Sequence, residues 1–94
     1  MISRQLDLFE CEHDDVIQEC EELERAYNTA PRDEAEERYG DYVDAVETGT
    51  EILADIRDHF KWTLDEDTGE LYEEEFNGAV LKRLPRFALE IENR

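Results

Sequence analysis

The sequence predicts an all-α protein: an antiparallel helical hairpin with a third helix packed on it, in the arrangement of a three-helix bundle with coiled-coil-like seams. Apolar residues recur at alternating spacings of three and four in two long stretches, which is the period of a helix that buries one stripe. Turn-forming residues and prolines fall between the stretches. A chain of 94 residues is long enough for one domain, so we expect a single unit over residues 1–94.

The first predicted helix covers about residues 10 to 28. Its faces away from the apolar stripe are rich in Asp and Glu, as expected for a surface in water. Residues 1–9 are either a flexible N-terminal peptide or the first turns of the same helix. The stripe consists of Phe9, His13, Val16, Cys20, Leu23, Tyr27 and Ala30.

The second predicted helix covers about residues 31 to 62, because Asn28 to Pro31 interrupt the first pattern and Pro31 is tolerated in a first helical turn. Gly49 lies on the seam, where glycine costs about 1 kcal/mol of helix propensity. We expect the close approach of a neighbouring backbone to compensate for this cost. The seam consists of Tyr39, Tyr42, Val46, Gly49, Leu53, Ile56 and Phe60.

Residues 63–72 allow two structures. The segment from Asp65 to Glu70 has the composition of a turn, so a small β-hairpin is possible in principle. Thr63 and Glu66 also fit a capping box at the start of a new helix. We favour a helix over residues 66–84 that Pro85 interrupts, followed by a short C-terminal tail, residues 85–94, forming one more helical turn or docking on the bundle.

The chain is strongly acidic, with 28 Asp and Glu, 10 Lys and Arg, and a net charge of −18. Such a charge is compatible with disorder, with mimicry of nucleic acid, or with adaptation to high salt. The periodic apolar residues argue against disorder. Salt adaptation is favoured because acidic residues are spread along nearly the whole chain and Lys61 and Lys82 are the only lysines. Direct binding of nucleic acid is not expected, since it requires a basic surface.

No stretch approaches the roughly 18 apolar residues of a membrane span, so no membrane association is expected. Residues 1–10 lack the apolar run of a secretory signal. On one helix, Cys11 and Cys20 would lie about 13 Å apart, too far for a disulfide. Reduced thiols in a cytoplasmic protein are the expectation.

The segment Gln5-Leu6-Asp7-Leu8-Phe9 resembles the pentapeptide by which many bacterial proteins bind the replicative sliding clamp. The resemblance implies that Leu8 and Phe9 fill an apolar pocket and that Gln5 forms a hydrogen bond at its rim. We favour the alternative, in which Leu6 and Phe9 begin the apolar stripe of the first helix.

The C-terminal third, from Thr63 to Asp67 and from Phe76 to Glu92, is similar to small uncharacterised proteins of halophilic archaea. This resemblance implies no activity and transfers no functional residues, but it agrees with a salt-adapted composition. The only basic cluster, Lys82, Arg83 and Arg86, lies in this segment. We expect it to pair with the chain's own carboxylates rather than with phosphates.

Acidic residues also raise the question of metals and catalysis. Glu10 and His13 have the spacing of di-iron helices, but no second pair matches them. A metal-dependent nucleotide hydrolase would need paired acids facing inward, and the pairs Glu19 with Glu22 and Asp55 with Asp58 lie off the seams. This hydrolase is therefore a minor alternative, and no catalytic residue, metal or cofactor is predicted.

The function expected from the sequence is a non-enzymatic module for protein–protein interaction that self-associates, most simply as a homodimer completing a four-helix bundle. The second helix is long for a three-helix core of this size, so part of its seam needs a partner. The predicted partner-binding residues are Tyr39, Tyr42, Val46, Leu53, Ile56 and Phe60.

Overall fold

The computed structural model describes residues 1–94 as helices joined by short turns, without strands, which confirms the all-α prediction and excludes a β-hairpin at residues 63–72. The chain forms five α-helices and one 3₁₀ turn, η1. Their bounds are α1 Ile2–Glu12, α2 Asp14–Thr29, α3 Ala35–Lys61, α4 Glu66–Arg83, η1 Pro85–Phe87 and α5 Ala88–Glu92.

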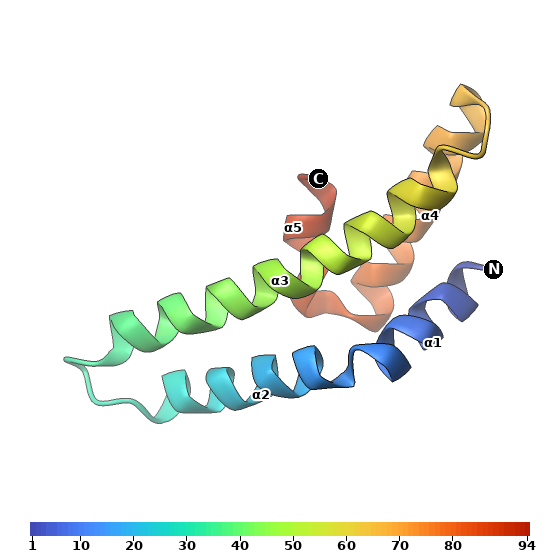
Figure 1. Ribbon diagram of the computed structural model, residues 1–94. Helices are drawn as coiled ribbons and strands as arrows, with labels where there is room; N and C mark the ends of the chain where they lie inside the picture. Colours follow the sequence, from blue (N-terminus) through green and yellow to red (C-terminus); the bar gives the residue numbers. More distant parts are fainter.

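Helix α3 is the axis of an elongated molecule that measures 50 × 24 × 19 Å. In Figure 1, α2 runs antiparallel beside one half of α3, and α4 turns back along the other half. Helix α1, η1 and α5 pack with α4 around this second half. The two partners of α3 therefore cover different parts of its length.

The first predicted helix is divided in two at His13, whose backbone has φ −122° and ψ 32°. The His13 amide still donates to the carbonyl of Phe9, and its own carbonyl accepts from Val16 and Ile17, so the break leaves few unpaired backbone groups. Residues 2–9 are part of α1, where Leu6 and Phe9 are buried. The change of direction lets α1 pack on α4 while α2 packs on α3.

Helix α4 begins one residue after its cap, Asp65, whose carboxylate accepts a hydrogen bond of 2.8 Å from the Thr68 amide. The expected cap, Thr63, instead donates its hydroxyl to the carbonyl of Phe60 at 2.6 Å. The start of α4 was thus placed correctly from the sequence, but the capping residue was wrong. Asp65 is favoured because its side chain reaches an amide that has no helical partner.

The core surrounds the C-terminal half of α3. Phe87 packs edge-on against Phe9, with ring centroids 5.9 Å apart, and its own ring lies on Gly49. A Cβ at Gly49 would come within 2.5 Å of Phe87 Cε1, so an aromatic side chain, rather than a neighbouring backbone, makes the close approach. The large apolar side chains of the core are Leu6, Phe9, Val46, Leu53, Tyr72, Phe76, Val80, Phe87 and Ile91.

The end of the molecule at the turn between α2 and α3 contains no buried residue. We call residues 21–44, the end of α2, the connecting turn and the start of α3, the hairpin end. None of its residues is buried, and all 17 buried residues lie outside it. Most of this end consists of two helices without a third layer (Figure 1). Only its inner edge touches other segments, where Leu23 and Tyr42 pack against the core and Arg86 contacts Tyr42 and Glu24.

None of the helices combines the length and the apolar character that crossing a lipid bilayer requires.

Candidate interaction surfaces

The predicted seam of α3 is divided by the structure into three parts. Its middle belongs to the core of the chain, where Leu53 is fully buried, Val46 nearly so, and Ile56 packs against the same cluster. The expectation that Val46 and Leu53 contact a partner therefore has to be corrected. Their partners are the side chains of the chain's own C-terminal segments, which fold back over this part of α3.

The N-terminal end of the seam lines an open cleft of about 170 Å³ beside α5. Tyr39 is 51 % exposed and Leu89 is 73 % exposed. Tyr42 is half-buried, since it packs against the core, and Arg86 Nε donates to its hydroxyl at 3.2 Å. We call Tyr39, Tyr42, Val43 and Leu89 the hairpin face.

The C-terminal end of the seam lines a larger groove of about 680 Å³. It lies where the start of α1 meets the turn between α3 and α4, at the right-hand end of Figure 1. We call it the terminal groove. Its apolar lining residues are Met1, Ile2, Phe60, Leu64, Leu71 and Tyr72.

The residues of the clamp-like pentapeptide are folded into α1. Phe9 is fully buried, and Gln5 accepts a hydrogen bond of 2.7 Å from the Tyr72 hydroxyl. The resemblance would place Leu8 and Phe9 in a clamp pocket. Of these two, only Leu8, which is 52 % exposed, is available to a partner. In this structure, clamp binding through Phe9 would require α1 to leave the core.

The basic cluster near the C-terminus pairs within the chain, which confirms the sequence prediction for its two arginines. Arg83 binds Asp7 and lies 2.8 Å from the Glu10 carboxylate, so it joins α4 to α1. These hydrogen bonds to Glu10 and Asp7 raise the pKa of the Arg83 guanidinium. Arg86 lies 3.3 Å from the Glu24 carboxylate.

Arg57 is a fully buried residue that the sequence interpretation missed. Its Nη1 donates to Asn77 Oδ1 and to the carbonyl of Ile91, both at 3.0 Å, and its Nε donates to Asp58 at 2.9 Å. Its Nη2 has no hydrogen-bond partner and lies 3.6 Å from Glu73. A charged group at this depth has to be held by several acceptors, so Arg57 joins α3, α4 and α5.

A positional signal for Arg57 is present in the sequence. It stands four residues after Leu53, in a buried stripe that continues the helical spacing from Val46 through Thr50. Because Arg57 is charged, the spacing of apolar residues alone does not indicate that it is buried.

The other chemistry-bearing residues do not gather into a site. Cys20 is buried, which raises the pKa of its thiol, and Cys11 is an exposed free thiol. No group of three or more His, Cys, Asp or Glu side chains is placed to hold a metal ion. A cleft of about 410 Å³ lies beside Arg83 and Arg86, but both arginines already bind carboxylates of the chain.

Comparison of the chain with protein-family models, with curated proteins and with solved structures finds no match. What the protein binds has to be inferred from its own surfaces, of which the hairpin end and the terminal groove are the two most distinctive.

Proposed function

We propose that the protein is a non-enzymatic helical interaction module that self-associates through its hairpin end. The observation that supports this proposal is the absence of any buried residue from Glu21 to Asp44, although both helices continue through that segment. Helices gain most of their stability from packing an apolar face, so two helices without a third layer need further cover. Two hairpins from two copies would supply it as a four-helix bundle.

The apolar contacts of such a dimer come from the hairpin face. A two-fold contact uses the same surface on both copies, so each copy presents both an exposed side chain and a cleft. Tyr39 and Leu89 are the exposed side chains, and the cleft beside Val43 can receive them. Of the six seam residues predicted to bind a partner, Tyr39 and Tyr42 are the ones in the hairpin end. The structure adds Val43 and Leu89 to the proposed contact.

The charges of the hairpin end are compatible with pairing between copies. Residues 21–44 contain nine acidic residues and three arginines. The arginines, Arg25, Arg32 and Arg38, are exposed and belong to none of the ion pairs of the chain. In a two-fold contact the arginines of each copy meet carboxylates of the other.

The excess negative charge opposes association at low ionic strength. Ion pairs engage Asp7, Glu10, Glu24, Glu51, Asp58 and Glu73, so 22 of the 28 acidic residues are unpaired. At 1 M salt the Debye length is about 3 Å, so the repulsion between exposed charges that are farther apart than this is largely screened. The proposal therefore includes adaptation to high salt, with the dimer forming as the salt concentration rises.

The test is light scattering of the full chain in solutions from dilute buffer to several molar KCl. We expect a dimer at high salt, and we expect Tyr39→Ala combined with Leu89→Ala to give a monomer that is still helical. Leu8→Ala is the matched control, because Leu8 is equally exposed on α1 and should leave the dimer unchanged. A monomer at every salt and protein concentration would exclude the proposal.

A further inference from the structure

We propose that Arg86 is the positioning residue of the hairpin face. It holds Tyr42 against the C-terminal segment and so arranges the cleft for a second copy before the two copies meet. This inference rests on the self-association proposed above and names a residue outside the hairpin end on which that association depends. Arg86 lies in η1, which follows α4 in the sequence but packs on α3.

The hairpin face is built from two elements that have to be held together. Tyr39, Tyr42 and Val43 belong to α3, whereas Leu89 belongs to α5. All four line the cleft of about 170 Å³, and Arg86 lines it with them. Moving α5 away from α3 would separate Leu89 from the tyrosines, so the cleft depends on the docked C-terminal segment.

Arg86 makes the polar contacts between the C-terminal segment and the hairpin end. Its Nε donates to the Tyr42 hydroxyl at 3.2 Å, and its Nη2 donates to the Glu24 carboxylate at 3.3 Å. The guanidinium carbon lies 6.0 Å from the centre of the Tyr42 ring. Arg86 therefore joins α2, α3 and η1, and no other side-chain hydrogen bond or ion pair connects residues 21–44 to the segments after α3.

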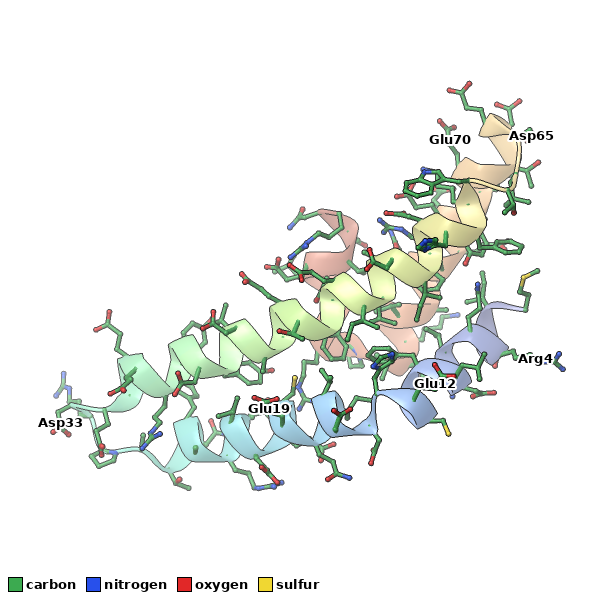
Figure 2. All side chains as sticks on the ribbon, in the orientation of Figure 1. Arg4, Glu12, Glu19, Asp33, Asp65 and Glu70 are labelled. Atoms are coloured by element: carbon green, nitrogen blue, oxygen red, sulfur yellow. The ribbon has the colours of Figure 1, made fainter.

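The core holds Arg86 in place. The Arg86 side chain is only 22 % exposed, and the next residue, Phe87, is buried against Phe9 and Gly49. The tip of the hairpin end lies far from this anchor, where Asp33 extends outward in Figure 2. The hairpin end is therefore fixed to the rest of the chain at its inner edge, which is where Tyr42 lies.

This arrangement favours association because it orders Tyr42 in advance. A side chain that becomes fixed only on binding lowers the affinity, whereas one that is already fixed does not. Without Arg86, the Tyr42 side chain can turn about its torsions in the monomer. A two-fold contact contains the residue twice, so an affinity loss of about threefold per copy becomes about tenfold for the dimer.

The experiment measures the dimer dissociation constant of the full chain by sedimentation equilibrium in several molar KCl. The variants are Arg86→Gln, Tyr42→Phe and the two combined. Tyr42→Phe keeps the ring and removes only the hydroxyl that accepts the hydrogen bond. Circular dichroism in the same salt shows whether each variant is helical, and if Arg86→Gln were not, Tyr42→Phe alone would decide the test.

Arg83→Gln is the matched control. Arg83 also joins a C-terminal helix to carboxylates near the N-terminus, but it does not line the cleft of the hairpin face. Its replacement changes the net charge by the same amount as Arg86→Gln. Any effect that follows from lost charge or from lost stability alone should therefore appear in both variants.

We expect Tyr42→Phe to weaken the dimer by about tenfold and Arg86→Gln by at least as much. The double variant should be no weaker than Arg86→Gln, because both changes remove the same hydrogen bond and their effects are then not additive. Arg83→Gln should leave the dimer constant within about twofold, because its site is separate from the contact.

A dimer constant that Arg86→Gln leaves unchanged would overturn this inference and leave the proposed self-association intact. Equal weakening by Arg86→Gln and Arg83→Gln would also overturn it, as would additive effects of Arg86→Gln and Tyr42→Phe. An unmutated chain that is monomeric under all conditions would overturn both this inference and the proposed function, so the two failures give different results.

Discussion

The two halves of α3 carry the same seam but have different surroundings. The C-terminal half contacts α4, η1 and α5, with α1 packed on α4 beside it. The N-terminal half packs along its length on α2, and it meets the C-terminal segments only near Tyr42, where Arg86 contacts the hydroxyl (Figure 1). The reason is length: the 18 residues of α4 span about 27 Å, and the 27 residues of α3 span about 40 Å. Helix α4 starts beyond one end of α3 and cannot reach the other. Periodicity therefore identifies a seam without showing what covers it.

The largest difference between the halves should appear when a large apolar side chain is truncated in each. Phe9→Ala removes a fully buried ring from the core and should lower the free energy of unfolding by about 3–5 kcal/mol. Leu23→Ala in the hairpin end, where the side chain is half-buried, should cost clearly less. Urea unfolding followed by circular dichroism in concentrated salt measures both.

The same experiment distinguishes the two interpretations of the pentapeptide. Leu8→Ala should change stability by about 0.5 kcal/mol or less, because Leu8 is exposed. If Phe9→Ala were as harmless as Leu8→Ala, α1 would not be part of the core, and a free docking peptide would be the better description.

The two halves also contain a matched pair of helical glycines. Gly49→Ala should destabilise the protein by about 1–3 kcal/mol, because the new Cβ meets the buried ring of Phe87. Gly40→Ala, in the hairpin end, has open space and should stabilise by up to about 1 kcal/mol. Thermal unfolding of both variants gives the comparison, and effects of the same sign would contradict it.

Backbone protection should differ between the halves in dilute protein at low salt. We expect amides of the hairpin end to be protected at least about tenfold less than those near Leu53, because no buried side chains hold that end together. Hydrogen exchange read by mass spectrometry measures this difference. Raising the salt and the protein concentration should protect the hairpin end selectively, and uniform protection under all conditions would argue against the comparison.

The smallest expected effect concerns the helix starts. Asp65 caps α4, but Glu34 makes no capping hydrogen bond at the start of α3. The Thr68 backbone amide holds the pKa of Asp65 below its ordinary value. The stabilisation that the Asp65 carboxylate provides is therefore complete when the pH is above the ordinary pKa of an aspartate. It is lost as the pH falls through the lowered pKa of Asp65. Asp65→Ala should reduce the melting temperature slightly at neutral pH, and the difference should vanish at strongly acidic pH.

The elements of the fold could be predicted because their signals are local. The alternating spacing defines the helices, and the turn residues place the start of α4 at Glu66. Tyr39, Tyr42 and Phe60 could be found as seam residues for the same reason, although the spacing alone does not show that they remain accessible.

The missed features depend on contacts between distant segments. The burial of Val46 and Leu53 requires the C-terminal residues to fold back over them, and no local pattern encodes that path. The buried position of Arg57 requires acceptors from Asn77 and Ile91. The break at His13 follows from the packing of α1 as well as α2, which a single heptad line cannot represent.

The attachment of α1 to the C-terminal segments has a consequence for the order of folding. Phe9 packs on Phe87, and Arg83 reaches Glu10 across 73 positions of the chain. The entropic cost of closing such a loop grows with the logarithm of its length and precedes any reward from the contacts. During synthesis, α1 is made before α4 and η1, so its docking site stays incomplete until Phe87 has been made. Until then Leu6 and Phe9 have no complete core to enter and are open to chaperones.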